Sequence, residues 1–173
     1  MLVTVVLGSS HLSPAHAAGL GSLQLAIEPG VSGLAPPFER RAFGYGGGLQ
    51  AELGLGEQLR ATVFGNRQTF PTRKPGVAVD VLGATLCYRL DDFRIAPTLE
   101  LGVANVSVSV NRHGVPATST VSVVGAGFEV VHFDWLLWGV VMRYYPLFGT
   151  DLLQAPAYAT LHGRIGLALD WGK

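Results

Sequence analysis

Apolar and polar residues alternate along most of this chain of 173 residues, in runs that are separated by Gly, Pro, Asn and Asp. Such alternation is typical of β-strands with one apolar and one polar face, and no stretch keeps the longer period of an amphipathic helix. We therefore expect an all-β chain. The pattern predicts eight strands, at about 20–28, 44–54, 58–67, 77–90, 93–110, 118–132, 135–146 and 157–171.

The connections between these predicted strands alternate in length. The second, fourth and sixth are tight turns, at 54–58, 90–92 and 133–134. The other four are longer and rich in Pro and Gly, at 29–43, 67–75, 111–117 and 146–157. In an antiparallel meander alternate connections lie at opposite ends, so one end carries short turns and the other carries long loops. That asymmetry is typical of transmembrane β-barrels.

The two faces of the predicted strands differ in charge. One face is apolar, and the other carries Glu and Arg with many Gly, which makes a poor solvent surface but suits a narrow lumen that paired side chains fill. We therefore predict an eight-stranded antiparallel up-and-down transmembrane β-barrel with a closed lumen. The predicted lumen ion-pair network comprises Glu52, Arg60, Arg94, Glu100, Glu129, Arg143, Arg164 and Asp170. Counting from the strand ends places Glu100, Arg143 and Arg164 near mid-height, with Gln24 alongside.

The last predicted strand shows the two faces most clearly. Its polar face carries Thr160, His162 and Arg164. A soluble ligand-binding barrel of the lipocalin kind, which is the main alternative, would turn the apolar face inward. The directions of Arg164 and Ile165 therefore discriminate between the two folds. The predicted lipid-facing residues of this strand are Leu161, Ile165, Leu167, Leu169 and Trp171.

Two positions interrupt the pattern within 93–110. Pro97 lies inside a strand that should be paired on both sides, so its missing N–H predicts a bulge or a local bend. Beyond Asn105 the apolar residues continue on the formerly inward face. Either a bulge or the emergence of the strand from the membrane would explain this change.

Together these features resemble the eight-stranded outer-membrane barrel superfamily, which includes the transmembrane domain of outer-membrane protein A and its small single-barrel relatives. The resemblance covers about 19–171. In that superfamily the last strand ends in an aromatic residue after alternating apolar residues, and the assembly machinery reads this signal. The residues that match it are Ile165, Leu167, Leu169 and Trp171. The resemblance implies a structural or adhesive role in the cell envelope, with the outer-membrane assembly machinery as a partner.

The first residues predict secretion. An apolar segment at 1–7 is followed by Ala-x-Ala ending at Ala17, which is typical of a signal-peptidase site. We therefore expect a signal peptide at 1–17 and a barrel at 18–173, located in the bacterial outer membrane after cleavage. The mean hydropathy is +0.36, yet no apolar run approaches the roughly 20 residues of a spanning helix.

Charge and composition narrow the range of possible binding partners. The formal net charge is zero, which gives no indication of nucleic-acid binding, and the single Cys87 excludes an intrachain disulfide and a Cys-rich metal site. Basic residues in the long loops suit the phosphates of lipopolysaccharide, because Arg pairs well with phosphate oxygens. We expect outer-membrane lipids as partners, a monomer, and neither cofactor nor metal. The predicted basic residues of the outer loops are Arg40, Arg41, Arg73, Lys74 and Arg112.

No residue pattern indicates catalysis. Some related barrels modify lipid A with a His, a Ser two residues away and a Glu. Here the only His-x-Ser lies at 11–13, inside the predicted signal peptide. We therefore expect no enzymatic activity. The alternatives to the structural or adhesive role are a lipid-A-modifying enzyme and a narrow gated channel.

Overall fold

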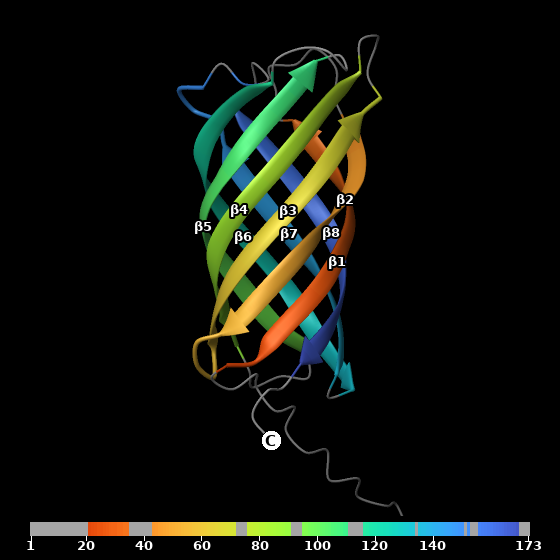
Figure 1. The fold of residues 1–173 in the computed structure, drawn as a ribbon, viewed down its shortest axis with the longest axis vertical. Coiled ribbons are helices and arrows are strands. Elements are labelled where there is room, and N and C mark those ends of the chain that lie inside the picture. The colour runs from red at the N-terminus through yellow and green to blue at the C-terminus, as the bar shows by residue number, and fades with distance from the viewer. Residues whose placement is uncertain are drawn as a thin grey trace, which may run out of the picture.

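Eight antiparallel strands form a closed barrel in which each strand pairs with its neighbours in the sequence and β1 pairs with β8 (Figure 1). The computed structural model describes residues 21–34, 43–71, 76–90, 95–110, 116–133, 135–150, 152 and 156–169. The strands are β1 (Leu23–Leu34), β2 (Phe43–Gly54), β3 (Leu59–Phe70), β4 (Val77–Arg89), β5 (Ile95–Val110), β6 (Ala117–Phe133), β7 (Leu136–Pro146) and β8 (Ala157–Leu169).

No helix in the described part of the chain is long and apolar enough to cross a membrane.

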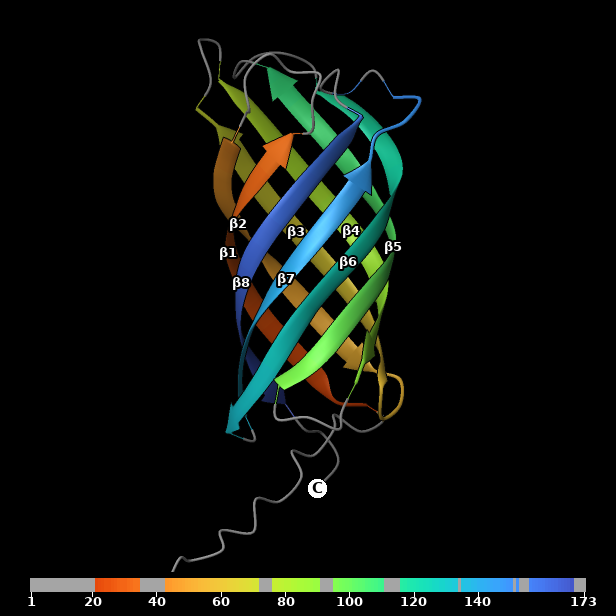
Figure 2. The ribbon, with the colours of Figure 1, turned by 180° about the vertical axis from the view of Figure 1, so that it is seen from behind.

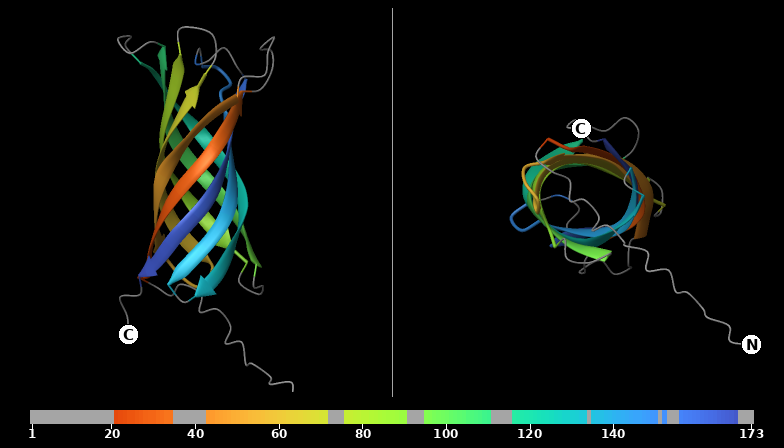
Figure 3. Two further views of the ribbon diagram at one scale, coloured as in Figure 1. Left: turned by 90° about the vertical axis from the view of Figure 1, so that its right-hand side faces the viewer. Right: turned by 90° about the horizontal axis from the view of Figure 1, so that it is seen from below.

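The strands are inclined to the barrel axis. Following the paired residues once around the barrel from Leu23 leads back to Gly33 of the same strand, and such a stagger requires tilted strands. Figure 2 shows this inclination from behind, and the end view in Figure 3 shows the closed ring. The connections after β2, β4 and β6 are shorter than the other four, which lie together at the opposite end.

The predicted end of the first strand is wrong. β1 continues through Pro29 and Gly30 to Leu34, where the sequence indicated a loop from Pro29 onward. The ladder to β8 omits Glu28 and Pro29, of which Pro29 has no N–H, and resumes in the same register at Gly30. A Cβ on Gly30 would lie 2.5 Å from the carbonyl oxygen of Leu161 and 2.9 Å from Cγ of His162, so glycine lets the backbone of β8 and that ring approach closely. The Pro-Gly pair thus serves packing within a strand and makes no turn.

The predicted loop at 67–75 also begins too early, because β3 extends to Phe70. Its inward alternation continues through Gln68 and Phe70, which are both buried. At the other end of the chain β8 is described as far as Leu169, and the predicted continuation to 171 lies outside the described residues.

The predicted bulge or bend at Pro97 gains no support, because its register with β6 continues without a shift. The carbonyl oxygen of Pro97 accepts a hydrogen bond from the N–H of Leu90 at 3.0 Å. The nitrogen of Pro97 faces the same side and cannot return a bond to Leu90, and this position lies just beyond the paired part of β4, which ends at Arg89. The register shift instead lies in β6, between Val131 and Phe133.

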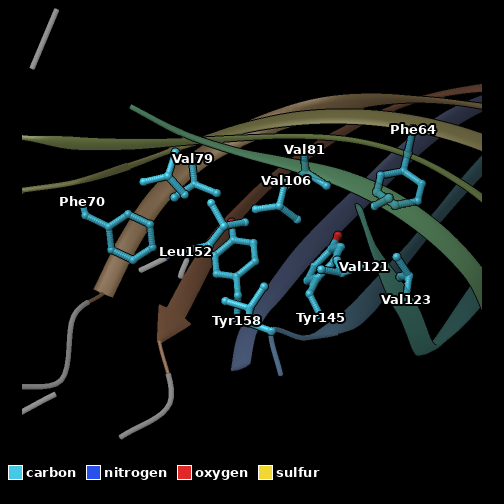
Figure 4. Packing of buried hydrophobic residues seen from close by; sticks show 13 residues of the cluster. Phe64, Phe70, Val79, Val81, Val106, Val121, Val123, Tyr145, Leu152 and Tyr158 are labelled. Atoms are coloured by element: carbon cyan, nitrogen blue, oxygen red, sulfur yellow. The ribbon is translucent and has the colours of Figure 1, made fainter. Parts of the chain in front are cut away.

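The inner face of the barrel changes character along its length. Toward the end with the short connections, which we call the lower tier, the buried side chains include Glu52, Arg60 and Glu129. Toward the opposite end, which we call the upper tier, the inner face is mainly apolar (Figure 4). The upper-tier cluster consists of Phe64, Phe70, Val79, Val81, Ala104, Val106, Val108, Val121, Val123, Tyr145, Leu147, Leu152 and Tyr158.

The outer face changes in the opposite sense. In the lower tier the exposed residues are apolar, and Leu99 and Leu101 on β5 are examples. In the upper tier of β3 to β6, the outward residues include Arg67, Asp80 and Asn105. Because the register of β5 is continuous at Asn105, the change of pattern there marks a change of environment and not a bulge.

Candidate functional site

The polar face of the barrel points inward. Arg164 is 3% exposed, whereas its neighbour Ile165 is 53% exposed. Leu161, Leu167 and Leu169 point outward with Ile165. This orientation is the reverse of a soluble ligand-binding barrel, in which apolar side chains line the cavity. The candidate site is therefore a charged lumen inside an apolar belt.

Arg164 on β8 lies at the centre of the lumen network. Its Nε donates to Glu28 at 3.1 Å, and its Nη2 donates to Glu100 at 3.0 Å. Its Nη1 donates to Glu52 at 3.1 Å and to Glu129 at 2.6 Å. One guanidinium group therefore contacts four carboxylates, and these four are the buried glutamates of the described residues.

Arg143 on β7 forms the upper part of the network. Its Nε donates to Glu100 at 2.7 Å, and its Nη1 donates to Glu28 at 2.7 Å. The side-chain oxygen of Gln50 accepts from Nη2 of Arg143 at 2.6 Å and from Nη2 of Arg164 at 2.7 Å. The Arg143 guanidinium also lies 4.1 Å from the ring centroid of Phe64, a member of the upper-tier cluster. Arg143 thus joins the ion pairs to the apolar core above them.

Arg60 on β3 forms the lower part. Its Nη1 donates to Gln24 at 2.9 Å, to Glu52 at 3.0 Å and to Glu129 at 3.1 Å. Arg89 on β4 lies 3.8 Å from Glu129 through its Nη1. Gln50 also donates to Glu52, which ties the lower part to the centre.

The ion pairs cross the lumen because they join strands that are not neighbours. Arg60 on β3 reaches Glu129 on β6, and Arg164 on β8 reaches Glu100 on β5. The side chains therefore fill the cross-section of the lower tier. The charges of the network also balance within the described residues. Its members are Glu28, Glu52, Glu100 and Glu129 with Arg60, Arg89, Arg143 and Arg164.

Solved structures share this architecture, although no family model matches the chain and no curated protein is significantly similar in sequence. The crystal structure of Neisserial surface protein A has a TM-score of 0.68 at 15% identity, covering 87% of this chain and 97% of that chain. The N-terminal barrel of OprF from Pseudomonas aeruginosa has a TM-score of 0.61 at 13% identity, covering 87% and 99%. Ail, the attachment invasion locus protein of Yersinia pestis, has a TM-score of 0.60 at 11% identity, covering 86% and 99%.

The fold is that of the small eight-stranded outer-membrane barrels. The fold class predicted from the sequence is therefore confirmed.

Within this outer-membrane barrel fold, the structure brings six of the eight predicted network residues into contact: Glu52, Arg60, Glu100, Glu129, Arg143 and Arg164. Arg94 and Asp170 lie outside the described residues, as do Trp171 and the loop residues Arg40, Arg41, Arg73, Lys74 and Arg112. The predicted network leaves out Glu28, Gln50 and Arg89, which the structure includes. Their inward parity, which places all three on the polar face, was the signal that could have added them.

Gln24 lies lower in this barrel than the sequence indicated. It contacts Arg60, whereas Gln50 occupies the place between Arg143 and Arg164. The reason is the tilt of the strands, because residues counted equally from the strand ends do not lie at equal heights when the ladder is staggered.

The described residues show no grouping of three His, Cys, Asp or Glu side chains that could hold a metal ion. The Nδ1 of His162 lies 2.9 Å from the backbone carbonyl oxygen of Glu28, and its ring is buried. This contact satisfies a carbonyl of β1 at the point where the ladder to β8 is interrupted. His162 therefore has a structural role in joining the ends of the sheet.

Proposed function

We infer that this chain is a small integral outer-membrane β-barrel with a lumen closed by side chains, and that it acts in the cell envelope as a structural or adhesive protein. The observation that carries this proposal is the pairing of an exposed apolar belt with a buried, charge-balanced lumen. In water such a belt would be a large unfavourable surface, whereas the hydrocarbon of a bilayer covers it. The proposal includes a monomer without cofactor or enzymatic activity.

The height of the belt matches a membrane. On β5 the outward apolar residues run from Ile95 to Val103. At about 3.3 Å per residue and a tilt of about 40°, eight residue steps span roughly 20 Å along the axis, close to the apolar band of about 25 Å on known barrels. At the lower rim, the rings of Phe133 and Trp135 stack with centroids 5.7 Å apart, and exposed aromatic side chains favour membrane interfaces.

The upper tier supports the proposed adhesive role. Its apolar core holds the strand ends in place above the belt, so that the four longer connections start from a rigid base. The name of Ail describes attachment and invasion, and that of Neisserial surface protein A describes a surface protein. We extend a surface role to this chain, with Arg40, Arg41 and Arg112 among the basic loop residues that would meet lipopolysaccharide phosphates.

Membrane fractionation tests the location. Expressed in a Gram-negative cell, the protein should stay in the outer-membrane fraction after carbonate extraction, and heating should change its gel mobility because the closed barrel resists detergent until it unfolds. Release by carbonate without detergent would contradict the membrane barrel. Cleavage of an N-terminal segment near Ala17 in the same preparation tests the predicted signal peptide.

Loop charge tests the adhesive role. A variant with Arg40, Arg41 and Arg112 changed to Gln should bind lipopolysaccharide and host cells several-fold more weakly at low salt, while heat-modifiable mobility stays unchanged. Equal binding by the wild type and the variant would remove the loops from the proposal and leave the structural role.

Planar-bilayer conductance tests the closed lumen. The wild type should show no steady ion current, because ion pairs between Arg164 and Glu100 cross the lower tier. A stable current from the wild type would favour a channel.

A further inference from the structure

The upper parts of β5 and β6 present an uncharged, hydrogen-bonding face to the outside of the barrel. Two rows of this face are already ordered, because Ser107 and Thr118 share a hydrogen bond of 2.9 Å and Thr120 donates to Asn105 at 2.6 Å. The residues that form this surface, which we call the hydroxyl face, are Asn105, Ser107, Ser109, Thr118, Thr120 and Ser122.

The hydroxyl face begins directly above the apolar belt. Val103 is the last apolar outward residue of β5, and Asn105 and Ser107 follow it on the same side. Each residue of a tilted strand rises roughly 2.5 Å along the barrel axis, which places these two side chains about 5 and 10 Å above Val103. A bilayer has a headgroup layer of roughly 5 to 8 Å on each side of its hydrocarbon. The hydroxyl face therefore begins at headgroup depth, at Asn105, and continues above it, at Ser107.

Among the described residues of this region, the charges favour sugars over phosphates. Arg67 and Asp80 are the neighbouring charged pair, 3.6 Å apart, and Asp80 lies beside Ser107 in the register. In the row of paired outward residues that crosses β3 to β6, the positions on β3 and β4 form a neutralised ion pair, and the positions on β5 and β6 carry hydroxyl groups. A phosphate would favour unpaired Arg or Lys, whereas sugar hydroxyls both donate and accept hydrogen bonds and match Ser, Thr and Asn.

The preformed hydrogen bonds also reduce the entropy lost on binding. The short side chains of Ser107, Thr118 and Thr120 have few rotamers, and their mutual contacts hold the oxygens in place while each hydroxyl keeps lone pairs for a ligand. The closed barrel leaves no strand edge here for a partner to extend, so binding must occur on the face of the sheet.

We propose that the hydroxyl face binds the saccharide headgroups of the surrounding outer leaflet, with the core sugars of lipopolysaccharide as the ligand. This inference rests on the proposed membrane location but is independent of the basic loops. It assigns to the barrel wall a recognition surface that faces the lipid layer and holds the barrel at a fixed depth in the membrane.

Methyl-selective NMR tests the proposal on the full chain in lipid nanodiscs. With lipopolysaccharide carrying core sugars, the methyl groups of Thr118 and Thr120 should show nuclear Overhauser contacts to sugar protons. Lipid A lacking the core should keep only the contacts to its own two glucosamines, and phosphatidylglycerol alone should show no sugar contacts. Contacts to water only in all three lipids, or contacts to acyl chains, would overturn the saccharide assignment. In every lipid, acyl contacts to Leu101 and Val103 report separately on the membrane barrel itself.

A variant tests whether the hydroxyl groups matter. Thr118→Val with Thr120→Val keeps the shape of both side chains, and it should reduce the stabilisation by lipopolysaccharide over phosphatidylglycerol about tenfold in the unfolding equilibrium, as expected for two lost hydrogen bonds. Thr69→Val, an exposed change on β3 outside this face, is the matched control and should leave the lipid difference unchanged. An equal loss in both variants would contradict a specific surface on β5 and β6.

Discussion

The lower and upper tiers are built from the same strands but have opposite polarity. In the lower tier charged side chains fill the lumen and apolar side chains face outward, whereas in the upper tier valines and aromatic rings fill the lumen and polar side chains face outward over β3 to β6. On β5 both changes occur together, since the inner face becomes apolar at Ala104 and Val106 where the outer face becomes polar at Asn105. Because the polarity of the inner face and that of the outer face invert at the same level, we infer that the surroundings change there from hydrocarbon to water.

The two tiers are stabilised differently. The upper tier resembles a small soluble barrel, in which burial of apolar area away from water stabilises the core. The lower tier has lipid outside, so burial gives little preference for the lumen, and specific hydrogen bonds and ion pairs hold the strands in register. Arg143, which contacts Glu28, Glu100 and the ring of Phe64, lies at the boundary between the two.

The largest expected effect comes from removing the centre of the lower tier. Arg164→Ala leaves four buried carboxylates without their shared partner and should cost about 3–5 kcal/mol of unfolding free energy. Urea unfolding in phospholipid vesicles, followed by heat-modifiable gel mobility, measures this cost. A loss below about 1 kcal/mol would mean that water enters the lumen and solvates the carboxylates.

The second largest expected effect comes from a charge on the outer face, whose cost in unfolding free energy should differ between the two tiers. Leu99→Arg places a charge in the middle of the belt and should cost about 2–4 kcal/mol. Ser107→Arg, on the same face of the same strand, should cost close to nothing, because its surroundings are already polar. The same vesicle assay compares the two variants, and equal costs would contradict the assigned boundary.

A cavity in the upper core should have a smaller effect. Val106→Ala removes two buried methyl groups from the upper tier and should cost about 2 kcal/mol, including the cavity. Val103→Ala removes the same atoms from the outer belt, where lipid can fill the space. We expect its cost to be clearly lower in vesicles, and the opposite order would remove the distinction between a water-driven core and a lipid-facing belt.

The smallest expected effect is at the exposed ion pair of the upper tier. Arg67 and Asp80 are 68% and 41% exposed, so Arg67→Ala should cost about 0–1 kcal/mol and less in high salt. Compared with Arg164→Ala, this variant shows how far the contribution of an ion pair to the unfolding free energy depends on its burial. A cost near that of Arg164→Ala would overturn this account of the lower tier.

The sequence was sufficient to predict the fold and to predict which side chains of each strand share a face. Alternation over two-residue periods located all eight strands, because an inside and an outside of opposite polarity leave that pattern in any closed sheet. It placed Arg164 and Ile165 on opposite faces, as the structure shows. Pro29 and Gly30 misled the prediction, since the same residues that form turns can also fit an interrupted ladder and a close side chain.

The partners across the lumen could not be predicted from the sequence. Which carboxylate meets Arg60 or Arg164 depends on the stagger of the closed barrel, and that stagger is a property of all eight ladders together. For the same reason Gln50, and not Gln24, lies beside Arg143. The emergence of β5 at Asn105 was one of two readings of the sequence, and only the continuous register removed the bulge.

Spin-label accessibility along the outer face of β5 tests the inversion of polarity most directly. Nitroxides placed one at a time at Leu99, Val103, Asn105 and Ser107 would be measured in lipid vesicles with oxygen as the apolar relaxing agent and a nickel chelate as the polar one. The account predicts that oxygen dominates at Leu99 and Val103 and that the chelate dominates at Ser107, with the crossover near Asn105. A label at Ser107 that only oxygen reaches, or one at Leu99 that the chelate reaches freely, would contradict it.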